Sequence, residues 1–165
     1  ASINYHFKSK EDLFIEIARS CLHGVNNILT LLEDKPESVD GFKMMLRSFL
    51  KLFCQLRTED PNSFLFINRN LDLFLDLDPE TFKNNIWKIK ERLTETIKYV
   101  QKKKILDKKI SPEIFATSLL SSLNHLLRDE KMNCAFGGGS VFDEEYRNKY
   151  INQVVDCFID GARER

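Results

Sequence analysis

The sequence lacks a surplus of charge of either sign. Its 25 lysine and arginine residues are balanced by 25 aspartate and glutamate residues, so the formal net charge is 0. Nucleic acids and membrane surfaces attract proteins with a surplus of positive charge, so the chain alone is not expected to bind either strongly. Long apolar runs are lacking as well, since none approaches the roughly 20 residues of a membrane span. We therefore expect no membrane partner.

The cysteine and histidine spacings that are typical of metal sites are also lacking. The 4 cysteines and 3 histidines are far apart. Most of the cysteines fall within apolar helical patterns, where a thiol behaves as a small hydrophobic group. We expect no metal and no cofactor, and the cysteine usage favours a reducing, cytoplasmic location. These residues are Cys21, Cys54, Cys134 and Cys157, and His6, His23 and His125.

Signals of catalysis are scarce. The glycine-rich stretch "FGGGS" lacks the following Lys-Ser/Thr pair of a phosphate-binding loop, and no predicted strand precedes it. Asp76, Asp78 and Glu80 lie at a predicted helix junction, where helix capping explains them. The sequence therefore indicates that the protein is not an enzyme.

Helical periodicity of apolar residues, in contrast, is present along almost the whole sequence. It predicts an all-α domain of about six helices. Ser9 and Asp12 form a capping pattern at the first helix start, and Asp78 and Ser111 each precede a proline suited to the first position of a helix. The predicted helices run from Ser9 for about five turns to the stretch Glu33 to Pro36, from near Phe42 to before Pro61, from about Asn62 to Pro79, from Pro79 to the run Lys102 to Lys104, from Ser111 to near Arg128, and from about Asp143 to the end.

The fifth predicted helix has no charged residue between Glu113 and Arg128, in the stretch "IFATSLLSSLNHLL". Leucines fill one side, whereas Ser118, Ser121 and His125 lie on the other at helical spacing. The outer face of a helix usually carries lysine or glutamate. An uncharged face of small serines therefore indicates a second buried surface. The alternative is an internal helix that is buried within a single chain.

The last predicted helix favours the first interpretation. Its apolar residues, from Tyr150 to Ile159, cover an arc of roughly 200°, which is wider than one core contact needs. Two consecutive helices with surface to spare predict a homodimer in which they form a four-helix bundle with a second copy. The candidate interface residues are Ser118, Ser121, Ser122, His125, Tyr150, Val154, Cys157 and Phe158.

The opening stretch "INYHFKSKEDLF" resembles the junction of TetR (tetracycline-repressor-like) transcriptional regulators, where an aromatic–His–Phe cluster ends the recognition helix of a helix-turn-helix. The resemblance covers about a dozen residues closely and the rest only in layout. It implies that residues 1–8 are the end of a DNA-binding domain and residues 9–165 are an effector-binding and dimerisation domain. It implies phosphate contacts for Tyr5, His6 and Lys10, and an apolar plug for Phe7; a simple helix-capping junction is the alternative.

Most of the helix-turn-helix is missing from this sequence. The chain alone is therefore not expected to read bases, and a longer parent protein would bind operator DNA as a homodimer. The function that the resemblance implies is a ligand-responsive transcriptional regulator, by preference a repressor. An all-α protein-interaction module without DNA binding is the alternative.

In this family a small molecule enters the helical domain. Phenylalanines concentrate in the second and third predicted helices, and such residues can form an adaptable pocket for an apolar or amphipathic effector. Three polar residues interrupt the apolar pattern of the third predicted helix and are candidates for contact with the ligand: Asn68, Arg69 and Asn70. The alternatives are that the phenylalanines are ordinary core, that Arg69 reaches solvent and that His125 belongs to the dimer interface. The candidate pocket residues are Phe49, Phe53, Phe64, Phe66, Arg69, Phe74 and His125.

Overall fold

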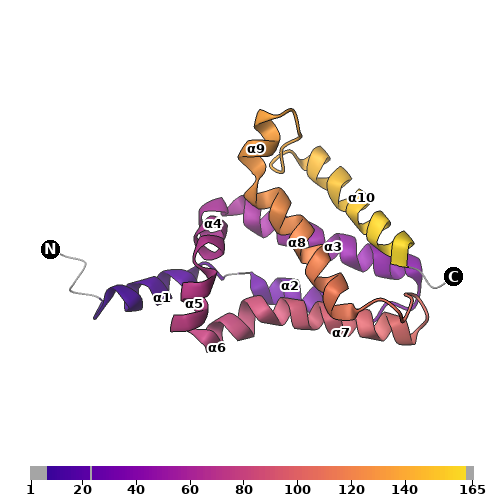
Figure 1. Ribbon diagram of the computed structural model, residues 1–165, viewed down its shortest axis with the longest axis horizontal. Coiled ribbons are helices and arrows are strands. Elements are labelled where there is room, and N and C mark those ends of the chain that lie inside the picture. The colour runs from indigo at the N-terminus through magenta and orange to yellow at the C-terminus, as the bar shows by residue number, and fades with distance from the viewer. Residues whose placement is uncertain (1–6, 23, 163–165) are drawn as a thin grey trace.

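The computed structural model describes residues 7–22 and 24–162 and shows an all-α fold (Figure 1). Within these residues no β-strand is formed. No helix in this part of the chain is long and apolar enough to cross a membrane. The helices are α1 (Lys10–Ser20), α2 (Val25–Leu31), α3 (Val39–Glu59), α4 (Pro61–Arg69), α5 (Leu71–Leu77), α6 (Pro79–Phe82), the π-helical turn η2 (Lys83–Trp87), α7 (Lys88–Lys102), α8 (Pro112–Arg128), α9 (Glu130–Ala135) and α10 (Glu144–Ala162).

Three predicted helix starts are confirmed by their caps. Ser9 Oγ accepts a hydrogen bond from the Asp12 amide at 3.0 Å. Asp78 Oδ1 accepts from the Thr81 amide at 3.2 Å, and Ser111 Oγ accepts from the Ile114 amide at 3.3 Å. Each bond satisfies an amide of the first turn that has no partner within the helix. These starts were predictable because the capping residue and its partner are three positions apart.

The prediction of one long first helix is wrong, because the chain forms two helices, α1 and α2, that are separated near Gly24. The φ angle of Gly24 is +83°, in the left-handed region that side chains rarely adopt. A Cβ atom built there would lie 2.8 Å from both terminal methyl groups of Leu56 on α3. The backbone therefore turns at a point where another helix approaches closely. The apolar periodicity continues through this turn, which is why the sequence predicts one helix.

We expect Gly24→Ala to lower the free energy of unfolding by about 1–3 kcal/mol, because the alanine must adopt a left-handed conformation and displace Leu56. Urea denaturation measures this change. Gly161→Ala is the matched control, because it lies within α10 and a Cβ atom there meets nothing within 4 Å. The control variant should be as stable as the wild type or slightly more stable. Equal stability of the two variants would contradict the tight approach of Leu56.

Two further differences separate the structure from the predicted helices. The third predicted helix is divided at Asn70, whose Nδ2 donates to the Phe66 carbonyl oxygen at 2.7 Å. The short helix α9 is missed, because the stretch "EKMNCA" has no apolar periodicity. Glu130 at its start accepts hydrogen bonds from Ser140 Oγ at 2.5 Å and from the Val141 amide at 2.9 Å. α9 is thus tied to the loop that follows it by contacts that local sequence cannot reveal.

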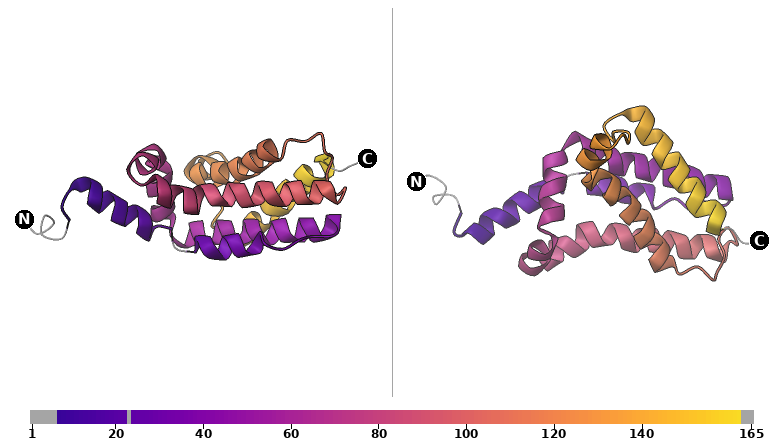
Figure 2. Two further views of the ribbon diagram at one scale, coloured as in Figure 1. Left: turned by 90° about the horizontal axis from the view of Figure 1, so that it is seen from below. Right: turned by 45° about the horizontal axis from the view of Figure 1, so that its top comes forward.

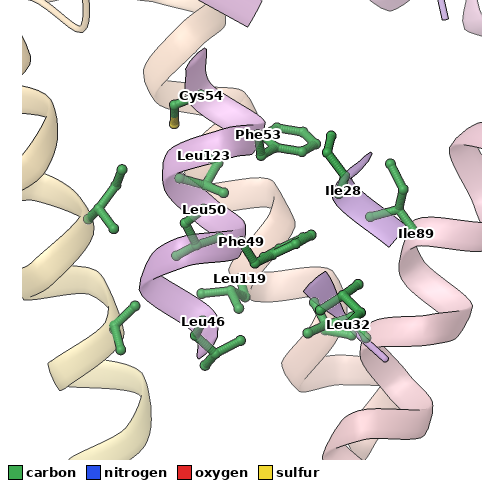
Figure 3. Packing of buried hydrophobic residues seen from close by; sticks show 14 of the residues in the cluster. Ile28, Leu32, Leu46, Phe49, Leu50, Phe53, Cys54, Ile89, Leu119 and Leu123 are labelled. Atoms are coloured by element: carbon green, nitrogen blue, oxygen red, sulfur yellow. The ribbon is translucent and has the colours of Figure 1, made fainter. Parts of the chain in front are cut away.

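Helix α3 is central to the packing of the domain. α2 and α10 pack against it, and α8 crosses over it and over α7 (Figures 1 and 2). Buried side chains from α2, α3, α7 and α8 form one hydrophobic cluster, part of which is shown in Figure 3. α1 projects from one end of this body and contacts α4 and α5 (Figures 1 and 2). The domain therefore joins α1 to the core through α4 and α5.

Candidate functional site

A cavity of about 100 Å³ lies between α3, α4, α7 and α8. Its lining is mostly apolar, with an arginine and two asparagines among the side chains. Such a composition, apolar with a few polar groups, is typical of small-molecule sites. The lining residues are Phe53, Arg57, Phe64, Ile67, Asn68, Leu71, Ile86, Ile89, Leu120 and Asn124.

Arg57 is the charged residue of this cavity. Its guanidinium carbon lies 5.1 Å from the ring centroid of Phe53 and 5.4 Å from that of Phe64, and both distances are within the range of cation–π contacts. The residue is half-buried, but its Nε atom is wholly buried and has no hydrogen-bond partner among the described residues. Burial lowers the pKa of Arg57, although the guanidinium stays charged at neutral pH. A positive charge is therefore held in a desolvated position between two aromatic rings.

Of the phenylalanines predicted to line a pocket, some line this cavity and the others lie in the core or against another helix. Phe53 and Phe64 line the cavity. Phe49 is fully buried in the core, one turn from Phe53, with ring centroids 6.2 Å apart. Phe66 contacts Phe14 of α1 at 5.3 Å between ring centroids.

The other three candidates also lie away from this cavity. Phe74 is fully buried against Phe82, at 6.0 Å between ring centroids. Arg69 is exposed at the end of α4. His125 is exposed on α8, where its Nδ1 lies 2.7 Å from Asp129 Oδ2.

The sequence reasoning missed Arg57 and Asn124. Arg57 follows Phe53 by four positions, so it lies on the apolar stripe of α3. A charged residue on an apolar stripe is unusual, and this position could have identified Arg57 as a candidate site residue. Asn124 directly precedes His125, which was the predicted pocket residue. The structure places Asn124 in the lining of the cavity and leaves His125 outside it. Asn68, one of the predicted polar candidates, does line the cavity, and its Nδ2 donates to the Phe64 carbonyl oxygen at 3.0 Å.

The predicted DNA-backbone contacts fall mostly outside the described part of the chain. Tyr5 and His6 lie outside the described residues. Lys10 is the first residue of α1 and is exposed, so a phosphate could approach it. Phe7 is half-buried. The phosphate role of Lys10 stays a prediction.

The predicted dimer face on α8 is exposed in the single chain. Ser118, Ser121 and His125 are exposed, and Ser122 is half-buried. The carbonyl oxygen of Ser122 accepts a hydrogen bond from the Tyr150 hydroxyl at 3.1 Å. The outer face of α8 therefore presents small, uncharged side chains to solvent along several turns.

The wide apolar arc of α10 is explained largely within the chain. α10 packs against both α3 and α8, so it buries two faces. Phe158 meets Phe115 of α8 at 5.4 Å between ring centroids and at 81°, and Tyr150 and Val154 are also half-buried. Cys157 is exposed. The arc is therefore no independent argument for a dimer, and the homodimer stays a prediction that rests on α8.

Among residues 7–22 and 24–162, no three histidine, cysteine, aspartate or glutamate side chains are grouped so that they could hold a metal ion. The comparisons with known proteins add no family to this description. No protein-family model, curated protein or solved structure matches this chain.

Proposed function

We propose that this chain is the effector-binding and dimerisation part of a ligand-responsive transcriptional regulator, which binds operator DNA as a homodimer through a helix-turn-helix. The observation that supports this function is that two faces of α8 differ, since one lines the cavity and the other is exposed and uncharged. Leu120 and Asn124 of α8 line the cavity, whereas Ser118 and Ser121 lie on its exposed, uncharged face. A ligand in the cavity and a second subunit would thus contact the same helix. A ligand that prefers one position of α8 would then change how the two subunits are arranged.

A second set of contacts leads from the cavity to α1. Phe64 of α4 lines the cavity, and Phe66 on the same helix packs against Phe14 of α1. Arg19 of α1 also donates from Nε to Asp78 Oδ2 at 2.8 Å, at the junction of α5 and α6. α1 follows the TetR-like junction directly, so a displacement of α4 by a ligand would be passed toward the DNA-binding part.

Two experiments test the proposed function: sequencing of the reading frame upstream of Ala1, and a DNA-binding selection with the full-length protein. The reading frame upstream of Ala1 should encode two short helices with a basic face that continue into "ASINYHF". Selection from random duplex DNA with the full-length product should yield palindromic sites, because a twofold dimer reads two half-sites. The chain of residues 1–165 alone should show no sequence-specific shift on those sites. Specific binding by that chain alone, or an upstream frame without a helix-turn-helix, would contradict the proposal.

A protein-interaction module is the second candidate function. The observation that favours it is a group of exposed apolar side chains on α9 and the loop after it, of which Phe136 is 85% exposed and Met132 and Phe142 are also exposed. Sedimentation distinguishes the two candidates, because the regulator requires a dimer at micromolar concentration. A monomer would favour the interaction module.

A further inference from the structure

We infer that the cavity between α3, α4, α7 and α8 binds a compact apolar molecule with one carboxylate group, which the guanidinium of Arg57 holds. This inference rests on the proposed function in one respect only, which is that this ligand is the effector. Binding itself can be measured whether or not the parent protein recognises DNA. Three properties of the cavity support the inference: its charge, its polar groups and its size.

The charge of the cavity comes from Arg57. Arg47, on the same helix, is a useful comparison, because its Nε is also buried without a hydrogen bond. The guanidinium of Arg47 nevertheless donates from Nη2 to Asp156 Oδ1 at 2.7 Å. No carboxylate among the described residues forms an ion pair with Arg57. A partly desolvated charge without such a partner is costly, so an anion in the cavity would remove a cost that the free protein bears.

The polar groups beside Arg57 suit a carboxylate. Asn68 of α4 and Asn124 of α8 line the same cavity. The side chain of Asn124 forms no hydrogen bond with another described residue, so its amide is available to a ligand. A carboxylate has two acceptor oxygens, which match the fork of the guanidinium and one further amide donor.

The size and lining of the cavity limit the rest of the molecule. About 100 Å³ is somewhat less than the cavity of about 150 Å³ that holds benzene in an engineered protein. The cavity is partly open to solvent, so the expected body is at most one aromatic ring or a short alkyl chain, of which one end stays at the mouth of the cavity. Phe53, Phe64 and Ile89 supply apolar contacts for it. The cavity offers one cation, so a second negative charge on the ligand would remain unpaired, which disfavours a phosphate monoester.

Calorimetric titration with matched acids and amides tests the inference. Benzoate and hexanoate are the acid probes, and benzamide and hexanamide are neutral molecules of nearly the same shape. The acids should bind to the wild-type chain roughly tenfold or more tightly than the amides, because hydrogen bonds to charged groups contribute the difference. Titration of inorganic phosphate should give no binding. Amides that bind as tightly as the acids, or phosphate that competes with benzoate, would overturn the inference.

Substitutions test whether Arg57 causes the preference for acids over amides. Arg57→Gln should remove the preference for acids, so that benzoate and benzamide bind alike, and Arg57→Lys should retain part of it. Arg69→Gln is the matched control, because Arg69 is exposed and does not line the cavity. The control should keep the full preference. If Arg57→Gln fails to fold, the comparison of acids and amides on the wild-type chain still decides the question.

Nuclear magnetic resonance shows where the acids bind. Benzoate should shift the side-chain amide signals of Asn68 and Asn124, and leave that of Asn152, which is exposed on α10, in place. Shifts elsewhere only would overturn the inference. If no acid binds and the full-length protein still selects palindromic DNA, the inference fails and the proposed function stands. If the acids bind at Arg57 and no DNA is selected, the proposed function fails and the site remains.

Discussion

Replacing Phe49 by alanine is expected to lower the free energy of unfolding by about 3–5 kcal/mol, as is usual when a large aromatic side chain is removed from a close-packed core. Phe49 has an exposed fraction of 0%. Figure 3 shows it on α3, in one cluster with Leu32, which follows α2, and with Leu119 and Leu123 of α8. The truncated side chain would leave a space that these neighbours cannot fill without moving. Urea denaturation of the purified chain measures the loss.

Phe136→Ala is the control for this experiment, because the same change is made at a side chain that is 85% exposed. Its effect should be within about 0.5 kcal/mol of zero. A Phe49→Ala variant as stable as this control would show that Phe49 is not packed in the core. The milder Phe49→Leu variant should leave benzoate binding unchanged, whereas Phe53→Ala should weaken it. The two phenylalanines are one helical turn apart, so this pair marks the boundary between core and cavity.

The starts of helices could be predicted from the sequence because they depend on neighbours in the chain. Ser9, Asp78 and Ser111 cap helices through amides three positions later. The turn near Gly24 could not be predicted in the same way. It depends on the approach of Leu56, which is remote in sequence, while the apolar spacing of α1 and α2 continues as if they were one helix.

The cavity could be predicted only in part, for a related reason. Helical periodicity identifies the apolar face of α3, but it does not reveal which neighbouring helix each residue of that face will meet. Phe49 and Phe53 share the face, yet only Phe53 lines the cavity. Arg57 lies on the same face, and its position four residues after Phe53 could have identified it. The arc of α10 was misleading, because one helix packed against both α3 and α8 needs apolar residues on two sides.

Replacing Ser121 by glutamate is expected to convert the predicted homodimer into a monomer. Ser121 lies on the exposed, uncharged face of α8, where a twofold axis would bring it close to a second copy of the same face. Two glutamates near that axis would repel each other and would lose water on association. Like charges that face each other across an interface cost several kcal/mol, so the dimer dissociation constant should rise roughly 100-fold or more. Sedimentation velocity over a range from about 1 to about 100 micromolar measures the change in association.

Ser48→Glu makes the same chemical change on an exposed position of α3 and should leave the dimer intact. Circular dichroism should be unchanged in both variants, because neither serine is buried. A Ser121→Glu variant that remains dimeric would place the association surface elsewhere, with the exposed Phe136 and Phe142 as the next surface to test. If the wild-type chain is itself monomeric, the outer face of α8 joins no second subunit and the interaction module is favoured. The uncharged outer face of α8 is therefore the feature on which the regulator proposal depends most directly.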